Sequence, residues 1–316
     1  MRALPVDEVA PGVFVATAET YTTTTTIVAG DDGHCLLVDP AVSVADLGAL
    51  ARWLSGRGLR PAAGWSTHPH WDHLLWSRAL GKVPRYATPR AAAVAARSRA
   101  ELVEAVQESA PGHDLVLFGQ VEALTGQEIG WPGPRAFVYP HDAHAPGHGA
   151  VFLPDSGVLM AGDMCSDIEI PLPDLDAPDP FGGYRAGLDI LAGIPGVTVV
   201  VPGHGHVGDA AEFRRRLAAD RAYLDAVAAG ADHPDPRLTE DWLRAEHARA
   251  LARARAAQRP APLPHWRNAA SRAAEVAGRP AVAARAWFPG LTCSRSRGQA
   301  VRSRTKTGIS RSVFFW

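Results

Sequence analysis

Four side chains that bind metals in many proteins lie within six consecutive positions of this chain. Residues 67–73 read Thr-His-Pro-His-Trp-Asp-His, which places His68, His70, Asp72 and His73 together. Neutral imidazole nitrogen and carboxylate oxygen are typical ligands of zinc and neighbouring divalent metals. Chance would produce such a string about once in a thousand sequences of this length and composition. The alternative is a polar loop whose histidines cap a helix, and we favour the metal site.

Three later loops carry further candidate ligands, and each follows a predicted strand. The candidates are His144 or His148 in the loop 141–148, Asp163 after Gly162, and His204 in the loop 202–206. Glycine and proline let the backbone turn tightly there, which would bring the ligands to a shared pocket. A single histidine at a strand end is most often structural, but four such places in one chain indicate a common site. His141 and His206 are expected outside the ligand set.

Hydrophobic periodicity predicts the elements that must position these residues. Strands are predicted at 13–16, 21–29, 35–38, 62–66, 115–118, 122–124, 127–129, 135–139, 150–153, 158–161 and 197–201. Helices are predicted at 45–59, 91–107, 181–191, 209–229 and 239–258, and another is expected to begin at Asp72 and His73. This order favours two stacked sheets with outer helices, followed by a helical extension. The candidate ligands fall at strand ends, where α/β proteins usually place their sites.

The composition is that of an ordinary globular protein with balanced charge. The 316 residues are 47% hydrophobic and 21% charged, with a formal net charge of −1, so there is no overall attraction to nucleic acid or anionic membranes. Cys35, Cys165 and Cys293 are too few and too far apart for a disulfide framework, which fits a reducing cytosol. We find neither a signal peptide nor a membrane span. We therefore expect a cytoplasmic protein, and the excess of Arg over Lys suggests a GC-rich bacterial genome.

The chain is expected to divide into three parts. Residues 1–210 contain all candidate ligands, 211–278 form a helical extension, and 279–316 form a tail with basic but no acidic side chains. The extension could form part of the pocket wall, or serve as scaffold and dimer contact. For the tail we prefer a disordered or extraneous segment over an arm for an anionic partner.

Residues 10–210 closely resemble the metallo-β-lactamase superfamily through the motifs described above. The resemblance rests on Thr67–His73, the His144–His148 loop, Gly162-Asp163 and Pro202–Gly205. It implies an α+β fold, a four-layer αββα sandwich, with a site for two metals along one edge of the sheets. One metal would be held by His68, His70 and His144, the other by Asp72, His73 and His204, and Asp163 would bridge both.

Two histidines compete for the ligand position in the loop 141–148. Family members often read Pro-Gly-His-Thr-Pro-Gly-His and use the first histidine as ligand. His144 and His148 have the same separation, and Ala145-Pro146-Gly147-His148 matches the second half of that string. We therefore select His144 and keep His148 as the alternative.

The resemblance implies a hydrolase with two divalent metals per chain, which we expect to be Zn²⁺, with Fe or Mn as alternatives. Two metals can share a water molecule and lower its pKa enough to form hydroxide near neutral pH. Asp72 would orient this nucleophile and handle its proton. We expect a small ester, thioester or lactone as substrate. The bulky Leu74-Leu75-Trp76 stands where glyoxalase II-type thioesterases carry small residues, which argues against that subgroup.

Two other activities remain open. A persulfide dioxygenase shares the His-x-His-x-Asp-His string but uses one iron, and such a site would not need His73 and His204. A metal-dependent phosphodiesterase or nuclease is disfavoured by the net charge outside the tail. As partners we expect a small-molecule substrate, no membrane and no nucleic acid, and we leave a homodimer open.

Overall fold

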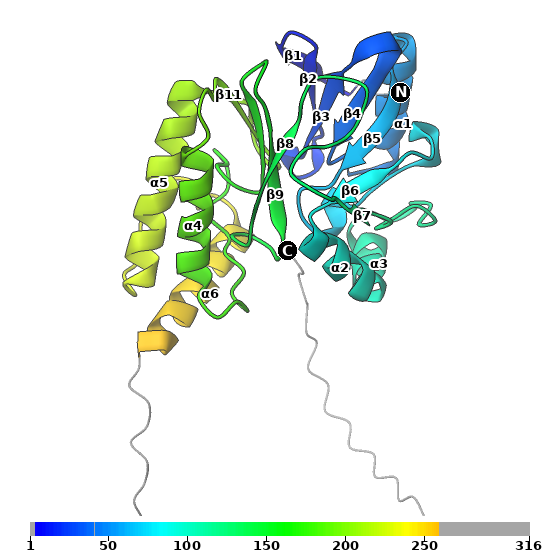
Figure 1. Ribbon diagram of the computed structural model, residues 1–316. Helices are drawn as coiled ribbons and strands as arrows, with labels where there is room; N and C mark the ends of the chain where they lie inside the picture. Colours follow the sequence, from blue (N-terminus) through cyan, green and yellow to red (C-terminus); the bar gives the residue numbers. More distant parts are fainter. Residues whose placement is uncertain (1–3, 41, 259–316) are drawn as a thin grey trace, which may run out of the picture. The chain divides into compact units, whose positions relative to one another are not determined.

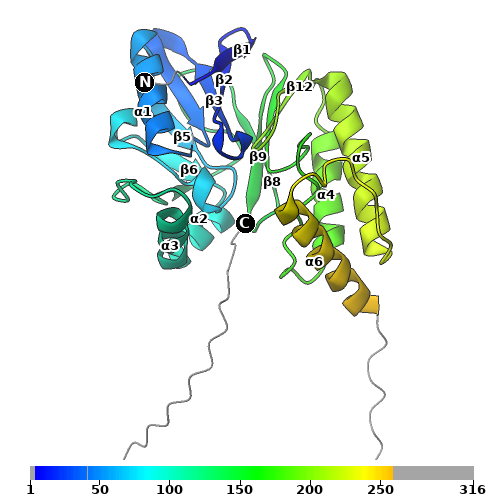
Figure 2. The same ribbon diagram turned by 180° about the vertical axis from the view of Figure 1, so that it is seen from behind.

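The computed structural model describes residues 4–40 and 42–258, which form one compact unit. Two β-sheets pack face to face, and helices cover the outer face of each sheet (Figures 1 and 2). The predicted four-layer αββα sandwich is thus confirmed. Residues 259–278 of the expected extension, the basic tail 279–316 and Cys293 lie outside the described residues.

The first sheet has seven strands that lie side by side in chain order. They are β1 (Val6–Ala10), β2 (Val13–Thr17), β3 (Thr24–Ala29), β4 (His34–Val38), β5 (Arg60–Trp65), β6 (Arg85–Ala87) and β7 (Glu122–Ala123). Neighbours are antiparallel from β1 to β4 and parallel from β4 to β7. Parallel neighbours need a long crossover connection. The helices α1 (Val44–Gly56), α2 (Pro89–Arg97) and α3 (Arg99–Ser109) provide crossovers and cover this sheet (Figure 1).

The second sheet has five strands in the order β12-β11-β10-β9-β8. They are β8 (Phe137–His141), β9 (His148–Leu153), β10 (Val158–Gly162), β11 (Val199–Pro202) and β12 (Gly208–Asp209). Its outer layer consists of α4 (Pro180–Ala192), α5 (Ala210–Ala228) and α6 (Asp241–Gln258). None of the helices in the described ranges is long and apolar enough to cross a membrane.

Side chains that alternate along the strands fill both sides of each sheet. In β2, Val13 and Val15 belong to the core between the sheets, whereas Phe14 and Ala16 pack beneath α1. This period of two follows from the pleat of a strand. Trp65 joins the sheets directly, because its indole Nε1 donates a hydrogen bond of 3.0 Å to the Gly149 carbonyl. The ends of β5 and β9 are thereby held together.

Polar residues define where the longer helices begin. The Ser43 hydroxyl accepts from Asp46 N at 3.1 Å, and the Asp46 carboxylate accepts from Ser43 N at 3.3 Å, which starts α1 with a capping box. The Asp209 carboxylate caps α5 by accepting hydrogen bonds from the backbone N–H groups of Ala211 and Glu212, both at 2.8 Å. α1 therefore begins six residues after the end of β4, and α5 directly after β12.

Several local predictions were wrong. Residues 115–118 form turns instead of a strand, since Phe118 N donates to Leu115 O and no neighbouring strand pairs with them. The expected strand 127–129 is reduced to an isolated bridge between Glu128 and Phe137. The expected helix 91–107 is divided into α2 and α3 at Ser98. The helix expected to begin at Asp72 is a single 3-10 turn, Trp71–His73.

Three strands were missed, β1, β6 and the two-residue β12, and the reason is their dependence on distant partners. β1 lies at the sheet edge and exposes part of its length, so its apolar pattern is weak. β6 has three residues, and it is a strand because it pairs in parallel with β5 and β7. Strand preference depends on such neighbours more than on local composition.

Candidate metal centre

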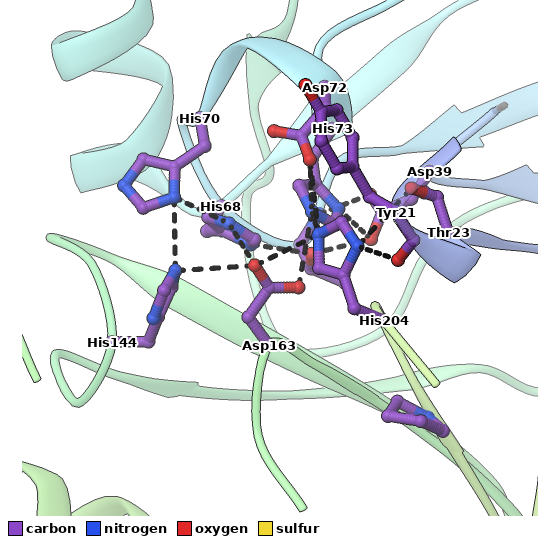
Figure 3. A network of polar contacts seen from close by, with 12 residues as sticks. Tyr21, Thr23, Asp39, His68, His70, Asp72, His73, His144, Asp163 and His204 are labelled. Carbon is purple, nitrogen blue, oxygen red and sulfur yellow. Dashed lines mark hydrogen bonds and ion pairs between the residues drawn. The ribbon is translucent and has the colours of Figure 1, made fainter. Parts of the chain in front are cut away.

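The candidate ligands gather at one edge of the sandwich, where strands of both sheets end (Figure 3). Backbone hydrogen bonds connect three chain segments there. Thr24 N donates to Gly203 O at 2.8 Å, and Gly203 N donates to Gly162 O at 2.7 Å. A Cβ atom on Gly203 would collide with the Asp163 carboxylate. Glycine is thus required where the loop after β11 crosses the loop after β10.

All seven residues selected from the sequence lie in two adjacent groups. Within each group, one potential ligand atom per residue lies within 4.8 Å of the others. The first group is His68, His70, His144 and Asp163, and the second is Asp72, His73 and His204. These side chains come from four parts of the chain that are far apart in sequence, 68–73, 144, 163 and 204. Only the fold brings them together.

The nitrogen atoms of the first group have the spacing of ligands around one metal. His70 Nδ1 lies 3.0 Å from His68 Nε2 and 3.0 Å from His144 Nε2. Asp163 Oδ2 lies 3.4 Å from each of the same two Nε2 atoms. Four ligands placed tetrahedrally at zinc bond lengths are separated by about 3.3 Å. The donors are therefore already at distances that one zinc ion would impose.

The second group has similar spacing. His73 Nε2 and His204 Nε2 are 3.3 Å apart, and Asp72 Oδ2 lies 3.1 Å from His204 Nε2 and 3.5 Å from His73 Nε2. The other oxygen of Asp163, Oδ1, lies 3.2 Å from His73 Nε2. Asp163 consequently stands between the groups (Figure 3): Oδ1 faces His73, whereas Oδ2 faces the first group and also lies 3.5 Å from His204 Nε2.

Oxygen atoms beside the far nitrogen of the imidazoles fix their orientation. Nδ1 forms a hydrogen bond with Thr67 Oγ1 in His68 (3.0 Å), with Leu172 O in His144 (2.8 Å) and with Tyr21 O in His204 (3.0 Å), whereas in His73 it forms an ion-pair contact with Asp39 Oδ2 at 2.9 Å. Carbonyl and carboxylate oxygens only accept, and the Thr67 hydroxyl already donates to Asp39 at 2.6 Å. Each Nδ1 therefore carries the proton, which directs the Nε2 lone pair into the site.

Two buried carboxylates dominate the electrostatics of the site. Burial alone would raise the pKa of Asp163, but the imidazoles of His73 and His204 outweigh burial and hold it well below its usual value. Burial would lower the pKa of His73, but nearby carboxylates, Asp163 first, raise it well above its usual value. The pKa of His204 is raised for the same reason. The carboxylates thus favour positive charge beside them. A divalent metal would supply that charge in place of the protons on His73 and His204.

The histidines of the first group are suited to bind metal as neutral ligands. Burial lowers the pKa of His68, His70 and His144, that of His70 to about 3, so all three are uncharged at neutral pH. Asp72 Oδ2 and Asp163 Oδ1 are buried and have no hydrogen-bond partner of good geometry. Such oxygen atoms are costly unless a cation satisfies them. Imidazole nitrogen, carboxylate oxygen and these unpaired atoms together fit two divalent metals of the zinc type.

The remaining histidines near the site lie outside both groups. His148 stacks on His68 with ring centroids 4.9 Å apart, and its Nε2 donates to Ala161 O at 3.0 Å. His141 packs in turn against His148. His206 is exposed and pairs with Asp167. The structure therefore puts His144 among the potential ligands and His148 behind them.

Sequence reasoning missed Asp39, which lies directly behind the site. Its carboxylate accepts from Thr67 N at 2.8 Å and holds His73 Nδ1 at 2.9 Å, so it orients one ligand and the start of the ligand loop. Asp39 also adopts the left-handed conformation, with φ of 47°. A polar residue followed by proline at the end of β4 was a signal, but in the sequence it reads equally well as the end of a strand.

Comparison with known proteins gives a family and a fold. A family model described as the metallo-beta-lactamase superfamily matches residues 19–204. A beta-lactamase domain protein from Burkholderia ambifaria has a TM-score of 0.58 and 20% identity over 78% of this chain and 87% of that chain. A metallo-beta-lactamase family protein from Thermus thermophilus has a TM-score of 0.56 and 23% identity over 78% of this chain and 93% of that chain. Likeness at such identities concerns the fold alone. No curated protein matches the chain.

We expect Asp163→Ala to reduce bound metal from about two ions per chain to one or fewer, and activity by about a hundredfold, because both ligand groups lose an oxygen. Metal is measured by elemental analysis after gel filtration. Asp189→Asn, which alters an exposed ion pair with Arg221, is the control and keeps full loading. Normal loading in Asp163→Ala would refute the bridging role.

We expect opposite effects on metal binding when the two loop histidines, His144 and His148, are replaced. We expect His144→Ala to lose the metal of the first group, whereas His148→Ala keeps both metals and lowers the free energy of unfolding by about 2 kcal/mol through a lost buried hydrogen bond and contact. Metal content and urea unfolding are measured for both variants. Metal loss in His148→Ala with full loading of His144→Ala would reverse the assignment.

Proposed function

Because the chain belongs to the metallo-β-lactamase superfamily, we propose that it is a hydrolase that uses two zinc ions to cleave a small ester, thioester or lactone. The observation that carries this proposal is the position of Asp163 between the two ligand groups: its carboxylate lies within 3.5 Å of imidazole nitrogens from both. A protein built for one metal would have no use for the second group, Asp72, His73 and His204.

Zinc held by these groups would lower the pKa of a water molecule toward neutrality and polarise the carbonyl under attack. Asp72 presents its buried Oδ2 beside His73 and His204, where it can orient the attacking water and accept its proton. The imidazoles are held by hydrogen bonds before substrate arrives, so little reorganisation accompanies the reaction.

A protein nucleophile is not needed and none is supported. Cys165 lies two residues after Asp163, but burial raises the pKa of its thiol well above the usual value. A buried, protonated thiol is unreactive. Water therefore remains the nucleophile in this proposal.

Aromatic side chains beside the second group favour an organic substrate. Tyr21 is 37% exposed, and its ring meets those of Trp71 and His204 edge to face at 6.3 and 6.5 Å. An exposed ring next to buried ligands offers an apolar surface to the acyl or leaving group of a small ester.

A buried carboxylate suggests which substrate charge the site accepts. Glu169 is 6% exposed, and no described residue forms a hydrogen bond or ion pair with its carboxylate. The charged groups that act on it are His204, Asp163, Asp72 and His73, which places it near the ligands. Burial raises the pKa of Glu169 to about 7. Above pH 7, where this carboxyl is mostly ionised, we therefore expect neutral or cationic substrates to be preferred over anionic ones.

The substrate class is tested on metal-loaded protein with a panel of esters, thioesters, lactones, lactams and phosphodiesters. We expect turnover of the first three, loss of activity on chelation, and recovery with zinc. About two zinc ions per active chain would support the proposal. One iron per chain with oxygen uptake would instead indicate the dioxygenase, and exclusive cleavage of phosphodiesters would indicate the nuclease.

Glu169→Gln tests the charge preference without changing side-chain size. With p-nitrophenyl acetate and its anionic succinate counterpart, we expect the variant to raise the ratio of kcat/KM for the anionic over the neutral ester about fivefold, since a repulsive charge is removed. Glu122→Gln on the exposed strand β7 is the matched control. An unchanged ratio in Glu169→Gln would remove Glu169 from substrate selection.

A further inference from the structure

A second cluster of buried charges lies outside the metal centre, between α5 and the segment that leads to α6. The Arg237 guanidinium donates to Asp220 Oδ1 at 2.6 Å and to both oxygens of Asp235 at 2.9 Å. Arg237 and Asp220 are 8% and 1% exposed. Buried ion pairs often contribute little net stability, because desolvation offsets the attraction. Their contacts with the rest of the chain therefore indicate what they do.

Those contacts lead to the loop that follows the bridging carboxylate. Arg237 Nη1 donates to Ser166 O at 3.2 Å, and the nearby backbone N–H of Cys165 acts to lower the pKa of the Asp220 carboxyl. Arg216, which is 3% exposed, donates to Cys165 O at 3.3 Å and to His206 O at 2.8 Å. Arg216 and Arg237 thus bind the successive carbonyls of Cys165 and Ser166.

The backbone at Cys165 needs such support. Its φ is 56°, in the left-handed region that residues other than glycine rarely adopt. A conformation of this kind persists only where surrounding contacts enforce it. Asp163 lies two positions earlier in the chain, so the course of the backbone at Cys165 determines where the Asp163 carboxylate begins.

The same contacts reach the ligand His204. The Ser166 hydroxyl donates to His204 O at 2.7 Å, and Arg216 holds His206 O two residues further on. The loops after β10 and β11 are therefore connected to each other and to α5. These loops carry Asp163 and His204, which belong to different ligand groups.

We propose that Arg216, Asp220, Asp235 and Arg237 form a loop clamp that positions Asp163 and His204 for metal binding. The loop clamp acts on the metal centre through the backbone of Cys165 and Ser166, so its members are positioning residues and not ligands. The proposal rests on the proposed metal centre. It makes metal affinity depend on α5 and on the segment before α6, which contain none of the seven ligand candidates.

Asp220→Asn tests the loop clamp, because it removes the charge with little change in size. The matched control is Tyr223→Phe on the same helix, which removes a buried 2.9 Å hydrogen bond to His247 and no hydrogen bond to either loop. Zinc affinity is measured by competition with a chromophoric chelator, and stability by urea unfolding of the metal-free proteins. We expect Asp220→Asn to weaken binding of at least one zinc ion about tenfold, and Tyr223→Phe to leave both affinities unchanged.

A second measurement needs no metal. In proteins with Cys35→Ser and Cys293→Ser, we expect the buried Cys165 thiol to react with a disulfide reagent about tenfold faster in Asp220→Asn than in Tyr223→Phe, since only the former frees the loop. If Asp220→Asn does not fold, Arg216→Lys replaces it. Lysine keeps the positive charge, but it lacks the guanidinium that donates to the carbonyls of Cys165 and His206.

Wild-type zinc affinity and slow labelling in the clamp variant would overturn the proposal. So would losses of affinity that follow the loss of stability equally in both variants. A third outcome separates the two proposals: Cys165 is labelled fast in Asp220→Asn, but the wild-type chain binds no zinc. That result would reject the metal-dependent function and the role of the loop clamp in metal binding, and would support only its effect on the loop.

Discussion

The structure depends on the burial of two carboxylates, Asp72 and Asp163, at one point. Like charges repel strongly away from water, and an unpaired buried carboxylate is costly. Imidazoles on every side make the burial tolerable, and the unpaired oxygens of both residues leave a place that a cation would fill. The same charges therefore explain the raised pKa of His73 and the capacity to hold divalent metals.

An αββα sandwich suits this arrangement because it brings the ends of two sheets to one edge. The bonds from Thr24 through Gly203 to Gly162 join β3 of the first sheet with β11 and β10 of the second. Ligands from the first sheet thus face ligands from the second across that edge. Behind them, Asp39, Leu172 and Tyr21 supply the oxygen atoms that orient the imidazoles.

The outer helices add a constraint that the sheets alone do not provide. The loops after β10 and β11 leave the regular hydrogen-bond ladder at the points where they carry ligands. Arg216 of α5 binds their backbone instead, at the carbonyl of the left-handed Cys165 and at His206 O. A helical layer that reads as scaffold in the sequence therefore contacts the backbone on which two ligands depend.

By itself, the sequence determined the layered α+β class and the ligand types, because alternation of apolar residues and His/Asp motifs at strand ends are local patterns. Motif spacing also favoured His144 over His148 as the ligand. Only the fold shows that His144 Nε2 faces His70, whereas His148 Nε2 bonds the Ala161 carbonyl. The strands β1 and β6, the 3-10 turn at His73, the role of Asp39 and the contacts of Arg237 were decided by tertiary structure. Each of these depends on partners distant in the chain, and local periodicity carries no information about such partners.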